Sequence, residues 1–421
     1  MLERYFYKPE TIDRIQDSWL AEPIERYVVW LSERQYADRS IIRRVPMLMR
    51  FGEFAQAHGA KTWADLPDYI EAFAVYWLGR NKRTFKKKET ERLATSAARK
   101  PIQQMLQLVV PEYSANQRVR LPLPFLEQVP GFFAYLKDER GLQKNTIKLY
   151  THNLRRFESY LLHIDLCELS MLSPAVLSAF VTQSSQELSK HPLKSLCEQL
   201  RIFLRYLYRE EITPQDLSIS LDIPRIYRLS DIPRSITWDE VRQMLEAVDR
   251  RSAIGKRDYA ILLLLVTYGL RSKEVAALTL KSVDWESERL RVPERKAGHS
   301  TAFPLSPIVG EAIVNYLQHG RPKSNERALF LRAVAPYSQL RWEAIAQRAT
   351  HYLRKADIQV GRPGSHTLRH TCVQRLIDAH FSLKTIGDYI GHGNPRSTEI
   401  YTKINVEALR DMALGDGEDV L

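Results

Sequence analysis

Apolar residues recur at spacings of three and four along most of this chain of 421 residues. That spacing places them on one face of an α-helix, so we predict a mainly helical protein. One helix is expected to have Thr146 as its N-cap, because a threonine hydroxyl can accept a hydrogen bond from the first turn. Its buried face would consist of Ile147, Tyr150, Leu154, Phe157 and Leu161.

The last third of the chain combines helical and extended patterns. The apolar run from Tyr259 to Tyr268 is too short to span a bilayer and is expected to form a buried helix. Two short segments, Leu290–Val292 and Thr301–Leu305, flank Lys296-Ala-Gly298 and predict a β-hairpin. The fold class is therefore expected to be mainly α, with a small antiparallel β-sheet in the last domain.

Two proline-containing stretches, residues 109–124 and 223–234, are expected to be linkers, because proline fixes φ and has no N–H donor. After the second linker, Thr237 and Glu240 have the spacing of a capping box at a helix start. Within the middle region, Ser173-Pro174 marks another helix start. We expect three domains: an extra helical domain over 1–115, a helical domain over 125–215 and an α+β domain over 228–421.

The first two domains resemble each other in sequence at an offset of about 106 residues. A repeat of this length indicates a duplicated domain, although amphipathic helices of similar length also align by chance. The matched pairs are Ser40 with Thr146, Arg50 with Arg156, Phe51 with Phe157, and Phe54 with Tyr160.

Lysine and arginine number 62 against 50 acidic residues, which gives a formal net charge of +12. This surplus makes nucleic acid the first partner to consider, but a protein without such a partner can also be basic. The three cysteines include no CxxC pair and indicate neither a disulfide framework nor a zinc site. Because the N-terminus lacks the apolar core of a signal peptide, we expect a cytoplasmic protein with no membrane segment.

Side chains that could bind a phosphate occur in four stretches of the last domain. Arg271 follows the predicted buried helix, and Glu274 lies three residues later on the same helical face. Lys296 lies in the predicted hairpin turn, and His366 and Arg369 are spaced to project together from a helix. Two guanidiniums can hold one phosphodiester, although Arg271 and Glu274 could equally be a structural ion pair.

The fourth stretch begins at Gly391-His392 and reaches Tyr401. Tyrosine is a weak nucleophile at its ordinary pKa of about 10, but neighbouring cations can stabilise its phenolate. By itself, Tyr401 could as well be a packing residue. His366 and His370 share an i, i+4 spacing, yet no glutamate between them and no third ligand in plausible spacing supports a metal site.

Taken together and in this order, these residues resemble the tyrosine recombinase, or phage integrase, family over residues 125–412. The stretch Thr267-Tyr-Gly-Leu-Arg-Ser-Lys-Glu-Val275 is similar to the family's first catalytic box. His366-Thr-Leu-Arg-His-Thr371, followed by Ile386–His392 and Ile400-Tyr-Thr402, is similar to the second. Phe132 to Tyr160 is similar to the helical, SAM-like core-binding domain. The resemblance thus implies a core-binding domain followed by an α+β integrase catalytic domain.

The resemblance also implies a role for each matching residue. Tyr401 would attack the scissile phosphate and leave a 3′-phosphotyrosyl link with a free 5′-hydroxyl. Arg271 and Arg369 would hold the non-bridging oxygens, and Lys296 would protonate the leaving 5′-oxygen. Because the tyrosyl bond conserves the phosphodiester energy and cations stabilise the transition state, no ATP, metal or other cofactor is expected.

The resemblance implies two further catalytic residues, His366 and His392, and a supporting residue, Glu274. His366 would assist proton transfer, His392 would hydrogen-bond the phosphate, and Glu274 would support the site. His370 is expected to be structural. Lys273 is two residues from Arg271 and would face elsewhere, where a backbone phosphate contact is more plausible than catalysis.

Double-stranded DNA is the partner that the resemblance implies. Each cation expected to contact phosphate in the core-binding domain could equally be part of a solvated charged face. These contacts are Arg140, Lys144, Lys148, Arg155 and Arg156. In the extra domain, a basic cluster would extend the contact with DNA, unless that domain binds another protein of the complex. The cluster consists of Lys82, Arg83, Lys86, Lys87 and Lys88.

The activity expected from the resemblance is site-specific recombination that integrates, excises or transposes a mobile element. A tetramer on two DNA sites would carry it out, formed by this chain alone or with other recombinases. A Xer-like resolvase is an alternative, but this chain is longer. A type IB topoisomerase shares the chemistry without the same HxxRH box and core-binding domain. The non-enzymatic alternative is a DNA-binding regulator descended from a recombinase, which the complete catalytic set disfavours.

Overall fold

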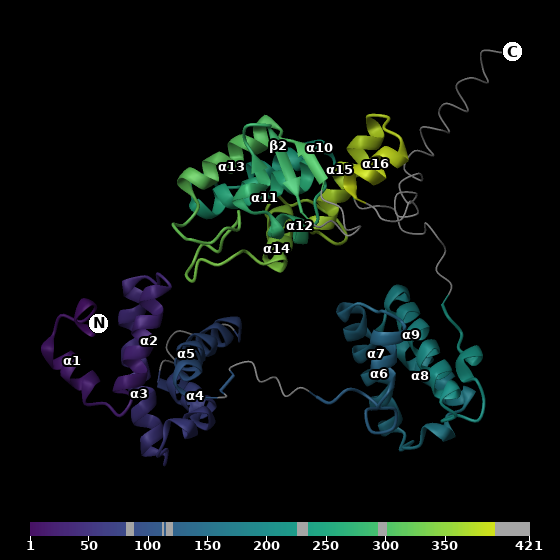
Figure 1. The fold of residues 1–421 in the computed structure, drawn as a ribbon, viewed down its shortest axis with the longest axis horizontal. Coiled ribbons are helices and arrows are strands. Elements are labelled where there is room, and N and C mark those ends of the chain that lie inside the picture. The colour runs from purple at the N-terminus through teal and green to yellow at the C-terminus, as the bar shows by residue number, and fades with distance from the viewer. Residues whose placement is uncertain (81–87, 112, 115–120, 225–234, 294–300, 392–421) are drawn as a thin grey trace. The chain divides into compact units, whose positions relative to one another are not determined.

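The computed structural model describes the chain except residues 81–87, 112, 115–120, 225–234, 294–300 and 392–421. Helices predominate in the described residues, and one three-stranded antiparallel sheet accompanies them, so the predicted fold class is confirmed (Figure 1). Residues Gln117–Ser230 form a compact unit separate from the rest. In the parts of the chain that the structure describes, no helix is both long and apolar enough to cross a bilayer.

The N-terminal region, residues 1–110, packs its helices around one hydrophobic cluster. The last helix, α5, contacts α2, α3 and α4 and so closes the bundle. The helices are α1 (Pro9–Gln16), α2 (Ala21–Glu33), α3 (Asp38–Ala57), α4 (Ile70–Arg80) and α5 (Lys88–Val109), with 3-10 turns at Leu2–Arg4 and Trp63–Tyr69.

The middle region has a second hydrophobic cluster, to which Phe132, Phe157 and Phe203 contribute fully buried rings. A π-helical turn at Tyr135–Glu139 extends its first helix, and 3-10 turns occur at Leu169–Met171 and Leu217–Ser220. Its helices are α6 (Phe132–Ala134), α7 (Lys144–His163), α8 (Pro174–Glu187) and α9 (Lys190–Arg209).

Two helix starts in this region were predicted, and one of them is wrong. Helix α7 begins at Lys144, with Gln143 in extended conformation as its N-cap, so Thr146 lies inside the first turn instead of capping it. The left-handed Gly141, with φ of +61°, turns the chain before that point, and nothing in Lys144 or Asn145 interrupts the helix. The start of α8 is confirmed: Pro174 is its first residue, and Ser173 Oγ accepts from Val176 N at 3.4 Å.

Helices α3 and α7 share local geometry at the offset of the sequence repeat. Each is 20 residues long, and both ends of α7 lie 106 residues after the ends of α3. The residues with positive φ that flank these helices match as well, at the same offset. They are Gln35 and Gly59 around α3, and Gly141 and Asp165 around α7.

Aromatic packing follows the same repeat. In each region, two aromatic residues on the long helix contact one aromatic residue on the next helix. The ring centroids are 5.3 Å apart for Phe51 and Phe73, 5.6 Å for Phe54 and Phe73, 4.9 Å for Phe157 and Phe180, and 5.1 Å for Tyr160 and Phe180.

The C-terminal region surrounds α11 (Ala253–Thr267), whose apolar run is buried as predicted. Its strands β1 (Val283–Asp284), β2 (Arg289–Val292) and β3 (Thr301–Pro304) pair antiparallel in that order, with Leu290 opposite Phe303. The predicted antiparallel pairing of the two strands is thus confirmed, while the predicted turn at 296–298 lies outside the described residues. The two-residue β1 was not predicted. The other helices are α10 (Trp238–Glu246), α12 (Ser272–Ala277), α13 (Pro307–His319), α14 (Trp342–Lys355), α15 (Ser365–Asp378) and α16 (Leu383–Ile390).

The predicted capping box at the start of α10 is also confirmed. Thr237 Oγ1 accepts from Glu240 N at 3.2 Å, and Glu240 Oε2 accepts from Thr237 N at 2.7 Å. Further along this region, Arg257 and Asp258 form a buried ion pair of 2.8 Å that the sequence pattern did not predict. Asp258 Oδ2 also accepts from Tyr352 Oη at 3.2 Å, which links α11 to α14 inside the core.

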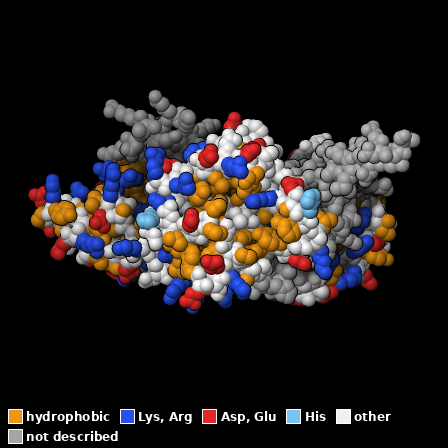
Figure 2. Space-filling model, turned by 90° about the horizontal axis from the view of Figure 1, so that it is seen from above, with side chains coloured by type: hydrophobic (Ala, Val, Ile, Leu, Met, Phe, Trp, Pro, Cys, Tyr) orange, Lys and Arg blue, Asp and Glu red, His pale blue; other side chains and the backbone are white. Residues whose placement is uncertain are grey.

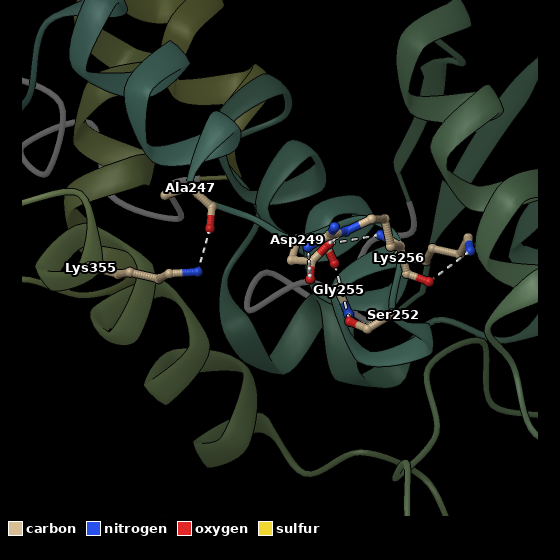
Figure 3. A network of polar contacts seen from close by, with 7 residues as sticks. Ala247, Asp249, Ser252, Gly255, Lys256 and Lys355 are labelled. Atoms are coloured by element: carbon tan, nitrogen blue, oxygen red, sulfur yellow. Dashed lines mark hydrogen bonds and ion pairs between the residues drawn. The ribbon is translucent and has the colours of Figure 1, made fainter.

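A tight turn fixes the start of α11, and Figure 3 draws its polar contacts. Ser252 Oγ accepts from Gly255 N at 3.0 Å and donates to Asp249 O at 3.1 Å. The turn passes so close to the helix that a Cβ on Gly255 would lie 1.9 Å from Asp249 O. Lys355 Nζ of α14 donates to Ala247 O at 2.7 Å (Figure 3). The Ser252 contacts fix the start of α11, and the Lys355 contact joins α14 to the residue that follows α10.

Candidate functional site

Arg271 lies directly before α12, in the turn that follows α11. Gly269 in this turn has a φ of +58°, a left-handed conformation that suits glycine, and a Cβ there would lie 3.2 Å from Cys372 Sγ. Glu274 Oε2 accepts from Arg271 N at 2.8 Å, and Glu274 Oε1 accepts from Arg271 Nη1 at 2.7 Å. One buried carboxylate therefore both caps α12 and orients the guanidinium.

Arg369 approaches the same place from α15. It is 5% exposed, and its guanidinium donates to Gly269 O and, through Nη2, to Ile390 O at 2.6 Å. Arg271 Nη2 donates to Gly391 O at 3.3 Å. Two guanidiniums that are 98 positions apart in the chain thus reach consecutive carbonyl groups at the end of α16. The tertiary structure brings together two cations that the sequence analysis placed in separate motifs.

His366 lies one helical turn before Arg369. The side chain is exposed, so solvent or a ligand can reach it. Its pKa lies below the ordinary value, because the protein around it partly desolvates the imidazolium and because Arg369 and Arg271 disfavour another positive charge. At neutral pH the ring is therefore neutral, and one of its nitrogens can accept a proton.

Aromatic packing joins the sheet to this cluster of cations. Phe303 on β3 contacts Tyr268, at 5.3 Å between ring centroids, and Tyr389 of α16, at 5.0 Å. Tyr268 Oη donates to Pro304 O at 2.9 Å and accepts from Ser306 N at 2.8 Å. No role for these aromatic residues was predicted from the sequence. The signal that could have found them is the placement of Tyr268 and Tyr389 three residues before Arg271 and His392.

Lys273 lies on α12, two residues after Arg271. The side chain is exposed, and Nζ lies 5.3 Å from the ring centroid of Trp342 on α14. His370 is partly buried on α15, one residue after Arg369.

Several residues predicted from the sequence lie outside the described part of the chain. Among the expected catalytic residues these are Lys296, His392 and Tyr401. Among the expected DNA contacts they are Lys82, Arg83, Lys86 and Lys87, together with the side chain of Lys88.

The expected phosphate contacts of the middle region fall into two groups. Arg155 and Arg156 make contacts within the region: Arg155 Nη2 donates to Pro122 O at 2.6 Å, and Arg156 pairs with Glu187. The other three are exposed, and no ion pair is found for them among the described residues. They are Arg140, Lys144 and Lys148.

On the face that Figure 2 draws, basic side chains are not gathered apart from acidic ones. Figure 2 shows Lys and Arg side chains spread over the face that it draws, with Asp and Glu among them. In the described ranges, no three His, Cys, Asp or Glu side chains are grouped so that they could hold a metal ion. The candidate site is the cluster of Arg271, Arg369 and His366.

Known protein families and relatives match most of the chain. The phage integrase family model matches residues 234–408, and the model of the phage integrase N-terminal SAM-like domain matches residues 129–212. A Sinorhizobium fredii protein named as an integrase/recombinase, y4rA, is 35% identical over 290 residues, which are 68% of this chain and 70% of that protein. A second one from the same organism, y4rF, is 26% identical over 98% of this chain and 95% of its own length. Tyrosine recombinase XerC of Pelotomaculum thermopropionicum is 28% identical over 67% of this chain and 95% of its own.

Two solved structures have a similar fold. The post-cleavage complex of the XerH site-specific recombinase with a palindromic difH substrate has a TM-score of 0.54 and 17% identity, over 83% of this chain and 96% of that chain. A lambda integrase dimer bound to a COC′ core site has a TM-score of 0.54 and 16% identity, over 74% and 86%. Together with the family models and the relatives, this shows that the chain belongs to the tyrosine recombinase, or phage integrase, family and is a DNA-binding site-specific recombinase that cuts and rejoins DNA strands.

Proposed function

We propose that this chain recombines the DNA of a mobile element, by integration, excision or transposition, through a 3′-phosphotyrosyl intermediate at Tyr401. The observation that supports the site is the convergence of Arg271 and Arg369 on the carbonyl groups of residues 390–391. His392 follows these residues directly in the chain. Each guanidinium has five N–H donors, so both can hold a phosphate while they keep the contacts that orient them.

In this proposal, the reaction is a transfer of one phosphoryl group between two oxygens. Tyr401 Oη forms a bond to phosphorus as the bond to the 5′-oxygen breaks. The phenolic proton passes to His366, whose lowered pKa keeps it neutral and able to accept, and Lys296 gives a proton to the leaving oxygen. Arg271, Arg369 and His392 stabilise the charge on the non-bridging oxygens. Rejoining reverses these steps with a new 5′-hydroxyl.

The arrangement of domains and subunits belongs to the same proposal. Residues 125–215 would be the core-binding domain, residues 228–421 the catalytic domain, and residues 1–115 a second, core-binding-like domain. The matched geometry of α3 and α7 supports the duplication. A tetramer on two DNA sites would perform the exchange, of this chain alone or with other recombinases. If residues 1–115 add a DNA contact, deleting them should shorten the footprint on DNA, and an unchanged footprint would leave the protein-binding alternative.

A nicked suicide substrate tests the chemistry, because the cleaved strand is lost by diffusion and the covalent adduct accumulates. The wild-type chain should form an adduct, and Tyr401→Phe should form none. Tyr259→Phe removes the hydroxyl of a tyrosine on α11, outside the cluster, and should leave the adduct unchanged. An adduct with Tyr401→Phe would exclude Tyr401 as the nucleophile. If the wild-type chain binds the target site but forms no adduct there, the alternative of a DNA-binding regulator is favoured.

A further inference from the structure

A basic hollow lies on the N-terminal region between the first turns of α3 and the middle of α5. Four cationic side chains line it: Arg39, Arg43 and Arg44 from α3, and Lys100 from α5. Ser40 adds a hydroxyl, and none of the described lining residues is acidic. Four positive charges around one hollow repel each other, so the arrangement favours an anion.

Arg44 is held in place by neutral groups. Its Nη1 donates to Tyr27 Oη at 2.8 Å and to Gln104 Oε1 at 3.2 Å, and its guanidinium lies 4.8 Å from the ring centroid of Tyr36. Burial raises the pKa of Tyr27 to about 12, so the phenol stays neutral and does not compensate the charge of Arg44. Among the described residues, Nη2 and Nε of Arg44 make no hydrogen bond.

A half-buried cation without a carboxylate partner is energetically costly, and an anionic ligand would remove that cost. The other three cations of the hollow are exposed, and no ion pair is found for them among the residues that the structure describes. Other arginines of this region do have acidic partners. Arg26 pairs with Glu22, and Arg99, beside Lys100, pairs with Glu71. Carboxylates therefore pair with arginines elsewhere in this region, but none lines the hollow.

Comparison with the repeated helix shows that the fold does not require these cations. At the positions in α7 that match Arg39, Arg43 and Arg44, the chain has Asn145, Leu149 and Tyr150. Tyr150 is buried, and Leu149 is 44% exposed. Since the same helix geometry forms with neutral residues at all three positions, the cations of α3 are available for a role other than folding.

We propose that this hollow binds phosphate groups of the DNA backbone and gives the recombinase a DNA contact in its N-terminal region. Arg44 would be the oriented donor at its base, and Arg39, Arg43 and Lys100 would be the mobile cations around it. Guanidiniums match phosphate oxygens in paired hydrogen bonds, and such contacts bind DNA without reading its sequence. The inference rests on DNA being the partner, but not on the catalytic roles proposed above.

The test compares two triple variants of the full-length chain that lose the same charge. The first carries Arg39→Ala, Arg43→Ala and Lys100→Ala. The control carries Lys8→Ala, Arg14→Ala and Lys61→Ala, which are exposed cations elsewhere in the same region. The binding constant for a long DNA duplex is measured against salt concentration, because each lost phosphate contact lowers the slope of log K against log salt by about 0.9.

The hollow variant should bind more weakly, with a slope smaller by about 2 to 3, while the control keeps nearly the wild-type slope. Equal slopes for both variants would overturn the proposal. A hollow variant that loses self-association but keeps the wild-type slope would also overturn it and make the hollow a protein contact. Circular dichroism establishes that both variants keep their helices. Adduct formation on a short nicked substrate should persist in both, which separates this test from that of Tyr401.

Discussion

Replacing Glu274 by glutamine tests whether one buried carboxylate positions Arg271. Glu274 is 6% exposed and Arg271 24%, and the carboxylate accepts from both the backbone N and Nη1 of that arginine. Glutamine keeps the shape but loses the charge and turns N–H donors toward the guanidinium. Breaking a buried ion pair costs about 3–5 kcal/mol, and the partial exposure of Arg271 lowers this, so we expect about 2–3 kcal/mol.

Native-state hydrogen exchange of the α12 amides measures this loss as a free energy of local opening. Glu240→Gln is the matched control, because Glu240 caps α10 with the same geometry at a partly exposed position outside the cluster. Its loss should be about 0.5–1 kcal/mol, the usual range for a helix cap. A loss at Glu274 no larger than the loss at Glu240 would mean that the contact with the guanidinium contributes little.

The same substitution should slow adduct formation on the nicked substrate. At about 1.36 kcal/mol per factor of ten, a loss of about 2–3 kcal/mol would slow adduct formation by at most about 30- to 160-fold. Because Glu274 acts through Arg271, adding Glu274→Gln to Arg271→Ala should cause little further slowing. Full additivity of the two effects, or a wild-type rate for Glu274→Gln alone, would refute the reasoning.

Three further predictions concern packing and protonation. Gly255→Ala should destabilise the C-terminal region by about 1–3 kcal/mol, because its Cβ would meet Asp249 O at 1.9 Å. Thermal unfolding checks this against Gly79→Ala, where a Cβ would meet no described neighbour within 4 Å besides its own helix backbone. Phe303 and Phe330 are both buried rings of the C-terminal core, and Phe330 stacks on Tyr316. Phe303→Ala and Phe330→Ala should each cost about 3–5 kcal/mol in stability. In assays below the unfolding range we expect slower adduct formation only for Phe303→Ala, whose ring packs between Tyr268 and Tyr389. The pKa of His366 in the folded chain lies below its unfolded value of about 6.5. As the pH falls through about 6.5, the unfolded state therefore binds a proton that the folded state does not. The free energy of unfolding falls with it until the pH has passed the folded pKa. His366→Gln should lose less stability than the wild type between about pH 7 and 5 in thermal unfolding, and an equal loss would contradict this sign.

Local patterns in the sequence predicted most of the elements, because helix periodicity and capping depend on residues a few positions apart. The buried face of α7, the capping box of α10 and the antiparallel pairing of β2 and β3 all follow from such patterns. The start of α7 was misplaced at Thr146, because the left-handed Gly141 and the extended Gln143 end the preceding turn, and threonine need not be the cap of a helix that contains it. The two-residue β1 is too short to have a pattern of its own.

The sequence by itself determined which side chains the site has and in which order they occur. It also determined the family, since motif spacing is sufficient to identify it. Only the tertiary structure decided that Arg271 and Arg369 reach the same end of α16, because that contact joins residues far apart in the chain. The same is true of the buried pair Arg257–Asp258 and of the hollow around Arg44. Each of them depends on how separate helices pack, and no local pattern of charges records that packing.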